Sequence, residues 1–74
     1  MEVTAYLPIF EAGHLVAHLT VHINPASHAV RFEDKDGKRH ACTDERAAEI
    51  LTDIRKFDRD KWREIERHSL EGAQ

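Results

Sequence analysis

The sequence has few cysteines and no long apolar runs, and each scarcity excludes a class of protein. A single cysteine cannot form a disulfide within the chain, which favours a reducing cytoplasm. No apolar run approaches the length of a membrane span, and the start, Met1 to Val3, lacks the basic stretch of a secretory signal. We therefore expect a cytoplasmic protein with no membrane partner.

The chain also lacks a strong excess of charge of either sign. It carries 11 lysines and arginines against 14 aspartates and glutamates, for a net charge of −3 with neutral histidines. This balance opposes non-specific binding to nucleic acid, which needs a basic surface. With 41% hydrophobic and 34% charged residues among 74, the composition is that of one small globular domain.

Residues 14–23 show the clearest pattern in the chain, a strict alternation of apolar and other residues. Such alternation predicts a half-buried β-strand. His14, His18 and His22 fall on the non-core parity, four residues apart. On a strand, neighbours at this spacing are about 13–14 Å apart, too far to share one metal ion. We expect neither a metal site nor a cofactor.

Residues 3–10 are predicted to form the preceding strand, which pairs with residues 14–23 through a loop of Glu11, Ala12 and Gly13. Pro8 has no N–H for a ladder, so this is an edge strand. The three-residue loop places Phe10 opposite His14 and Tyr6 opposite His18. In this register the apolar parities of both strands share one face.

Two further strands are predicted at residues 28–33 and 38–42, after turns at residues 24–27 and 34–37. Pairing Ile23 with His28 again brings the apolar parities together. A three-residue loop would pair Glu33 with Arg39 on the outside and turn His40 and Cys42 inward. A slip of one residue would reverse this, so the burial of His40 and Cys42 stays open.

Two helices are predicted at residues 44–56 and 59–69, with Thr43 and Asp58 as their N-caps. The fold class is therefore α+β, a four-stranded antiparallel meander with two C-terminal helices packed on one face. The predicted core consists of Val3, Ala5, Leu7, Ile9, Leu15, Leu19, Val21, Ile23, Val30, Phe32, Leu51, Ile54, Phe57, Trp62 and Ile65.

The sheet face that the helices leave open is predicted to be rich in aromatic, histidine and arginine side chains. Such side chains are typical of the centre of a protein interface. We expect this face to bind a larger protein or protein complex, and self-association is an open alternative. The structural alternative is that these side chains form ordinary cross-strand pairs that stabilise the sheet. The predicted partner-binding residues are Tyr6, Phe10, His14, Val16, His18, His22, Arg31 and Arg39.

Other chemistry is weaker in the sequence. Cys42 and His40 share a strand face without hydrogen-bond reach, and no third group completes a nucleophilic site, so no catalytic residue is predicted. Exposed aromatics beside Arg31 and Arg39 also fit stacking of single-stranded RNA, and a nucleic-acid-binding or regulatory module is the alternative function. The negative net charge makes nucleic acid the less favoured partner.

In size and in the order of four strands and two helices, residues 3 to about 70 resemble small phage anti-CRISPR proteins. The resemblance is one of architecture, with no matching motif, so it assigns a role to no residue. It implies a non-enzymatic inhibitor, from a bacterium or its phage, that binds a larger bacterial defence complex. This agrees with the protein-binding interpretation of the open sheet face.

Overall fold

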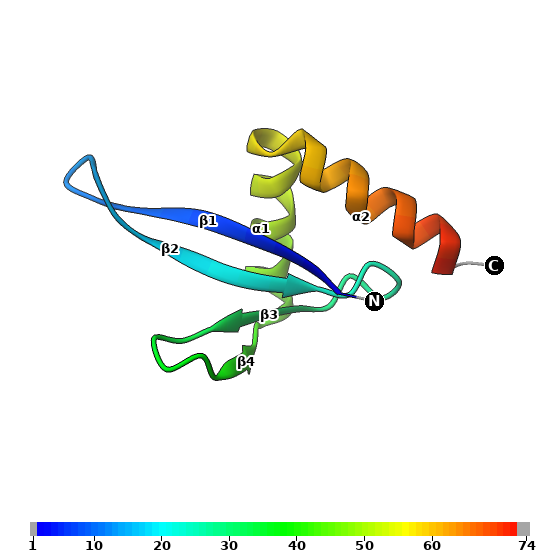
Figure 1. Ribbon diagram of the computed structural model, residues 1–74, viewed down its shortest axis with the longest axis horizontal. Coiled ribbons are helices and arrows are strands. Elements are labelled where there is room, and N and C mark those ends of the chain that lie inside the picture. Colours follow the sequence, from blue (N-terminus) through cyan, green and yellow to red (C-terminus); the bar gives the residue numbers. More distant parts are fainter. Residues whose placement is uncertain (1, 73–74) are drawn as a thin grey trace.

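The structure, a computed structural model, describes residues 2–72 of the chain. Four strands are followed by two helices, which confirms the predicted α+β fold class (Figure 1). The elements are β1 (Val3–Glu11), β2 (His14–Ile23), β3 (Val30–Glu33), β4 (Arg39–Ala41), α1 (Asp44–Phe57) and α2 (Arg59–Gly72).

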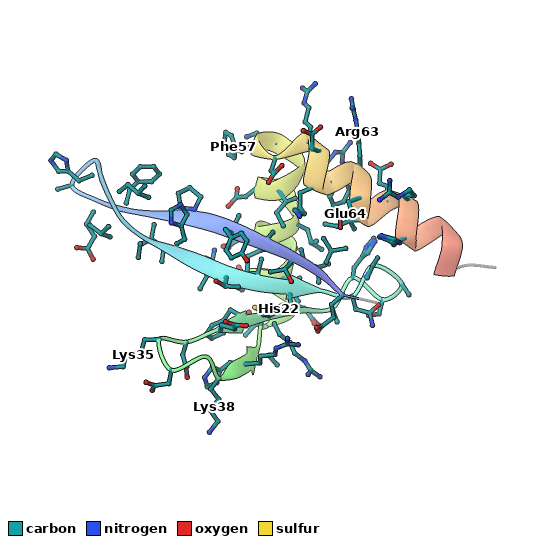
Figure 2. The ribbon with its side chains drawn as sticks, viewed as in Figure 1. His22, Lys35, Lys38, Phe57, Arg63 and Glu64 are labelled. Carbon is teal, nitrogen blue, oxygen red and sulfur yellow. The ribbon has the colours of Figure 1, made fainter. Side chains whose placement is uncertain are left out.

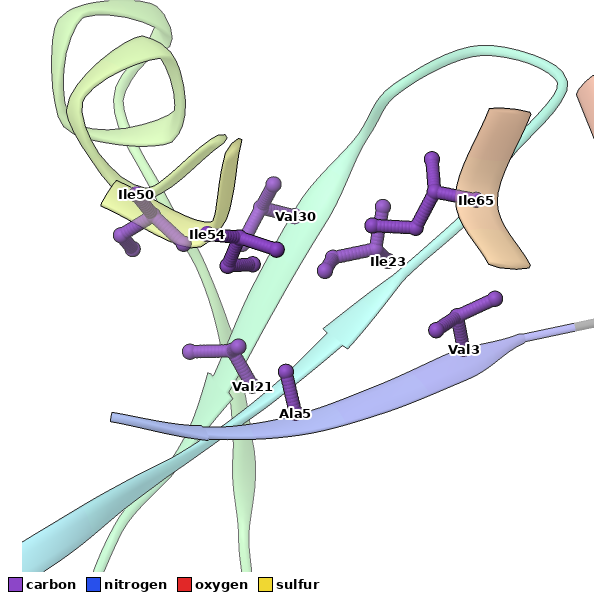
Figure 3. Close-up of a cluster of buried hydrophobic side chains, with 8 residues drawn as sticks. All are labelled: Val3, Ala5, Val21, Ile23, Val30, Ile50, Ile54 and Ile65. Carbon is purple, nitrogen blue, oxygen red and sulfur yellow. The ribbon is translucent and has the colours of Figure 1, made fainter. Parts of the chain in front are cut away.

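The strands form one antiparallel sheet in the order β1-β2-β3-β4, so β1 and β4 are its two edges. Both helices lie on the same face of this sheet, and the core forms between the two layers (Figures 1 and 3). Burying these side chains supplies most of the stability of the domain. The buried core residues are Val3, Ala5, Val21, Ile23, Val30, Ile50, Ile54 and Ile65.

The register of β1 and β2 differs from the predicted one by two residues. Val3 pairs with Ile23 and Tyr6 pairs with Thr20, whereas His18 had been predicted opposite Tyr6. The connecting turn contains two residues, Ala12 and Gly13, both with positive φ (50° and 81°), as in a type I′ turn. As far as the pair of Ile9 and Ala17, this shift of two keeps the side chains on their predicted faces, because side chains alternate with a period of two.

The pairing of β2 with β3 is shifted by two residues as well. Ile23 pairs with Val30 rather than His28, because Asn24 closes a longer turn. The Asn24 N–H donates to the Ala29 carbonyl (2.9 Å), and the Asn24 carbonyl accepts from the His28 N–H (2.7 Å). His28, with φ of 61°, thus belongs to the turn, and β3 is shorter than predicted.

The last hairpin has the predicted register, but β4 is shorter than the strand predicted at residues 38–42. Glu33 pairs with Arg39, and His40 lies opposite Phe32, their rings stacked with centroids 5.2 Å apart. Cys42 packs against the core as a partly buried side chain. The inward orientation of His40 and Cys42, left open by the sequence, is therefore the observed one.

The two helices begin at their predicted caps. The Thr43 side chain accepts a hydrogen bond from the Arg46 N–H (3.2 Å), and Asp58 accepts one from the Lys61 N–H (3.2 Å). The Asp58 N–H in turn donates to the Ile54 carbonyl (2.8 Å), so α1 ends where α2 begins. This sharp connection holds both helices over the same half of the sheet.

Three residues predicted to lie in the core are exposed instead. Ile9, Leu15 and Phe57 have exposed fractions of 39%, 53% and 81%. For Ile9 and Leu15 the reason is the length of the first hairpin, which extends well beyond the helix layer (Figure 1). The apolar pattern of β1 and β2 continues along this extension, but no helix lies above it to bury the side chains.

Candidate functional site

The distal half of the β1–β2 hairpin, residues 6–18 and here called the arm, projects beyond the helices (Figure 1). Isolated two-stranded hairpins leave both faces in water and have little stability of their own. Large apolar side chains are nevertheless concentrated there. Among the side chains that the structure describes, the large exposed hydrophobics are Tyr6, Ile9, Phe10, Leu15, Val16 and Phe57, all but Phe57 on the arm.

A β-bulge near the end of the arm changes which side chains share a face. Ile9 pairs with Ala17, but the next pair along is Phe10 with Leu15, which leaves Val16 without a partner. Residues directly opposite one another share a face, so Leu15 joins Phe10 rather than the core parity. The predicted pairing of Phe10 with His14 was therefore wrong, and His14 instead lies opposite Glu11.

The open face of the arm is consequently more apolar than predicted. Tyr6 and Phe10 lie on it with exposed fractions of 64% and 61%, and Leu15 extends the same surface towards the tip. Pro8 and His18, which pair with each other, lie between them. An exposed surface of this composition, with aromatic side chains at its centre, is typical of binding sites on small proteins.

A groove of about 500 Å³ runs between β1 and the C-terminal end of α1. Tyr6 and Phe10 of β1 and Phe57 of α1 are among its lining residues. Phe57 stands at the end of α1 nearest the arm (Figure 2). Sequence reasoning missed this groove, because Phe57 continues the apolar stripe of the helix one turn past the sheet. The lining residues are Tyr6, Leu7, Pro8, Phe10, Asp53, Ile54, Phe57 and Asp58.

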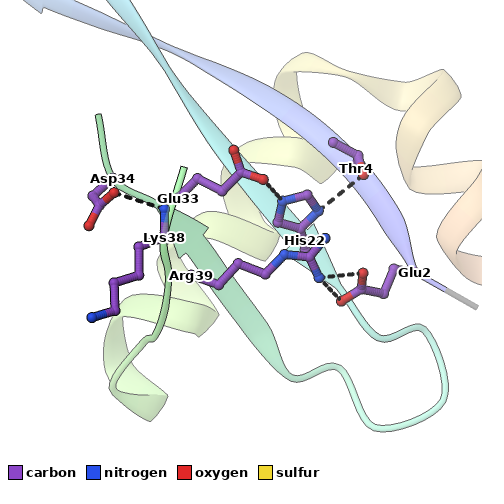
Figure 4. A network of polar contacts seen from close by, with 7 residues as sticks. All are labelled: Glu2, Thr4, His22, Glu33, Asp34, Lys38 and Arg39. Carbon is purple, nitrogen blue, oxygen red and sulfur yellow. Dashed lines mark hydrogen bonds and ion pairs between the residues drawn. The ribbon is translucent and has the colours of Figure 1, made fainter. Parts of the chain in front are cut away.

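His22 was predicted to be exposed for partner binding, and the structure corrects this. Its exposed fraction is 6%, and both ring nitrogens are engaged (Figure 4). Nδ1 lies 3.2 Å from the Thr4 hydroxyl and Nε2 lies 2.5 Å from Oε1 of Glu33. A buried imidazole with partners at both nitrogens stabilises the sheet and offers a partner protein no surface.

The two predicted arginines lie at the other end of the open face, away from the arm. Arg39 donates from Nη1 to both carboxylate oxygens of Glu2, at 2.7 and 2.9 Å (Figure 4). This hydrogen bond, more than the surrounding charge, holds the pKa of Glu2 below its ordinary value. Arg31 is exposed and lies between His22 and Ala41 in the sheet.

Thr4, His22 and Glu33 are joined in the order hydroxyl, imidazole, carboxylate, as in nucleophilic active sites. Their surroundings differ from such a site. The small cavity that His22 borders, of about 170 Å³, is lined by Glu2, Asn24, Ala29 and Arg31 and does not include Thr4. The three residues form a polar network that joins the side chains of neighbouring strands β1, β2 and β3.

His40 and Cys42 make no hydrogen bond to each other within residues 2–72. Nε2 of His40 lies 2.7 Å from Oδ2 of Asp34, and the ring stacks on Phe32. The bond from His40 is the largest of several that hold the pKa of Asp34 below its ordinary value; the Lys38 and Asp36 N–H groups contribute too. Within residues 2–72 no three histidine, cysteine, aspartate or glutamate side chains are grouped as metal ligands.

The structure thus separates the predicted partner-binding residues into two groups. Tyr6, Phe10, His14, Val16 and His18 lie together on the arm and are exposed. His22, Arg31 and Arg39 belong to the polar network at the base of the sheet. The first group, with Leu15 and the groove beside Phe57, is the candidate binding surface.

Comparisons with known proteins add no family and no relative. No protein-family model matches the chain, and no curated protein or solved structure matches it. Across the helices that the structure describes, none has the length and apolar character needed to cross a membrane.

Proposed function

We propose that this chain is a small, non-enzymatic protein-binding module whose partner is a larger protein or protein complex. The observation that carries the proposal is the concentration of exposed apolar side chains on the arm. Tyr6 and Phe10 are each more than 60% exposed, on a hairpin that the chain holds clear of its own helices. A fold that leaves its largest apolar side chains in water gains most when a partner covers them.

The chemistry of the arm favours a protein surface over a charged ligand. Tyrosine and phenylalanine bring large contact areas with few rotatable bonds, and they are over-represented among residues that dominate interface energies. From Val3 to Phe10 the strand has no charged side chain. An interface formed here would depend on apolar burial and would therefore resist salt.

Nucleic acid binding is the alternative function, and the geometry supports it less. Arg39, one of the two arginines on the open face, is held by Glu2, and Arg31 lies at the base of the sheet, outside the arm. The net charge of −3 repels phosphate, and aromatic stacking of bases needs an accompanying basic surface. Nucleic acid binding through this face would weaken steeply as salt rises.

We propose more specifically that the partner is a bacterial defence complex and that the chain inhibits it, as the architectural resemblance implies. Such an inhibitor acts by covering a surface that the complex needs. Expression of the chain should then restore phage growth on a host with an active CRISPR system, and Tyr6→Ser/Phe10→Ser should not. Undiminished defence in every system tested would remove this narrower form while leaving protein binding in place.

The proposal is tested by capture of proteins from a bacterial lysate on the tagged chain, at low and high salt, with mass spectrometry. Tyr6→Ser/Phe10→Ser removes the two exposed aromatics of the arm. Lys35→Ser/Lys38→Ser, at the β3–β4 turn, is the matched control, since it changes two exposed side chains far from the arm (Figure 2).

A protein retained at high salt by the wild type and the control, and lost with the arm variant, is the expected result. Capture that survives Tyr6→Ser/Phe10→Ser would contradict the proposal. Recovery of nucleic acid that salt releases would replace it with the alternative function.

A further inference from the structure

We propose that the groove between β1 and the end of α1 binds an extended, proline-rich segment of the partner that carries a basic residue. This inference rests on the proposed protein-binding function and names the class of partner segment. Three independent features of the groove support it: its aromatic walls, the missing backbone donor at Pro8 and the free carboxylate of Asp53.

Three aromatic residues are among those that line the groove. Tyr6 and Phe10 come from β1 and Phe57 from α1, and all three are more than 60% exposed in the chain. Grooves lined by aromatic side chains bind polyproline II helices, whose flat pyrrolidine rings pack on the aromatic rings. The groove, at about 500 Å³, has room for a few such residues.

The backbone of β1 disfavours the usual occupant of a strand edge, which is another strand. Strand addition needs alternate N–H and carbonyl groups on the free edge. Pro8 lies in the middle of β1 and has no N–H, and proline is tolerated in an edge strand where its nitrogen faces solvent. A polyproline II segment forms no ladder, so the missing donor costs it nothing.

The charge on the groove calls for a basic residue in the segment. Asp53 lies in the lining, is exposed, and makes no hydrogen bond or ion pair within residues 2–72. Asp58, by contrast, already accepts from the Lys61 N–H as the cap of α2. An arginine in the segment would find in Asp53 a carboxylate able to accept two parallel hydrogen bonds.

A second copy of the chain fits the groove less well. The strand that such a copy would present, Val3 to Phe10, has no basic side chain to meet Asp53. Pairing of the second copy's strand with β1 would also need a backbone N–H at position 8, which Pro8 lacks. Self-association is therefore an outcome that the experiment must separate from the proposal.

The test is titration of the isotopically labelled chain with a blocked synthetic peptide in which an arginine precedes proline–leucine–proline repeats, followed by NMR. Two control peptides replace the arginine by glutamate or the prolines by glycine. Asp53→Asn and Phe57→Ser change the groove, and Asp36→Asn, in the exposed β3–β4 turn, is the matched control for charge.

The expected result is a set of shifts confined to the backbone amides of residues 53–58 and of residues 6–10 other than Pro8. Asp53→Asn should weaken binding about tenfold, as expected for loss of a charge-assisted hydrogen bond, while Asp36→Asn leaves it unchanged. Phe57→Ser should abolish it. The glutamate and glycine peptides should both bind more weakly than the parent peptide.

Three results would overturn the inference. The first is that the wild type does not bind the parent peptide. The second is that Asp53→Asn and Asp36→Asn bind the parent peptide with the same affinity. The third is that the wild type binds the glycine peptide as tightly as the parent peptide. Concentration-dependent dimers that Phe57→Ser abolishes, without peptide binding, would assign the groove to a second copy. The proposed protein-binding function is tested by a different result: it fails if capture from the lysate survives Tyr6→Ser/Phe10→Ser. If the peptide does not bind but capture depends on Tyr6 and Phe10, only the inference about the groove fails.

Discussion

Arg39 in β4 and Glu2 ahead of β1 are 37 positions apart in the sequence, yet two hydrogen bonds of 2.7 and 2.9 Å join their side chains. Since β1 and β4 are the outer strands, this pair links the two edges of the sheet across its open face (Figure 4). It also places charge at the base of the sheet, whereas Glu11 is the one aspartate, glutamate, lysine or arginine of the arm.

Arg39→Ala should make the free energy of unfolding depend less on pH in the acidic range. Because the pKa of Glu2 is lowered in the folded chain, its contribution is fully present above the ordinary value of 4.5 and is lost as pH falls through the folded value. We therefore expect Arg39→Ala to unfold at lower urea than the wild type at pH 7, with the difference vanishing in acid. A difference that stays constant with pH would contradict this account of the pair.

His22→Ala should destabilise the fold and spare the binding surface. The substitution removes a side chain that is 6% exposed and leaves Glu33 and Thr4 without their hydrogen-bond partner. We expect a loss of about 1–3 kcal/mol in the free energy of unfolding, measured by urea titration. Folded His22→Ala protein should still capture the partner. Loss of capture without loss of stability would show that His22 is a partner-binding residue.

Ala12→Asn should stabilise the chain. Ala12 has φ of 50°, a conformation that asparagine tolerates better, and an Asn-Gly pair suits a type I′ turn. We expect a gain of roughly 0.5–1 kcal/mol, seen as a higher Tm. Gly13→Ala is the opposing control; no atom lies within 4 Å of the added Cβ, so its loss of about 1 kcal/mol would come from φ of 81° alone.

Ile54 and Phe57 lie one helical turn apart on α1 and should respond very differently to truncation. Ile54 is fully buried, so Ile54→Ala should cost about 2–4 kcal/mol and threaten the fold of so small a domain. Phe57 is 81% exposed, so Phe57→Ala should change stability by no more than about 0.5 kcal/mol. If Ile54→Ala and Phe57→Ala lowered the Tm by similar amounts, Phe57 would be shown to pack in the core and could not line the groove.

The sequence predicted the fold well because its strongest signal survives errors in register. Alternation in β1 and β2 assigns side chains to faces, and slips of two residues leave that assignment intact, as with Val3 opposite Ile23. The turns were harder. Nothing in alanine's preferences indicates that Ala12 would take a left-handed conformation and shorten the loop to two residues.

The candidate site was predicted in part. Tyr6 and Phe10 were recognised because they fall on the non-core parity of an edge strand. His22 shares that parity, but its burial depends on Thr4 and Glu33 reaching it from neighbouring strands, which no local pattern encodes. The exposure of Phe57 follows from where α1 ends relative to the sheet, a relation between elements that periodicity within one helix does not contain.

Pro8 has a consequence for the behaviour of the chain at high concentration. A free strand of nine residues with apolar side chains on both faces is the kind of template on which fibrils grow. Each added strand in such growth must hydrogen-bond to the edge before it, and the ring at Pro8 interrupts that sequence of bonds halfway along. The same residue that lines the groove thereby acts as a gatekeeper against edge-to-edge growth from the apolar arm.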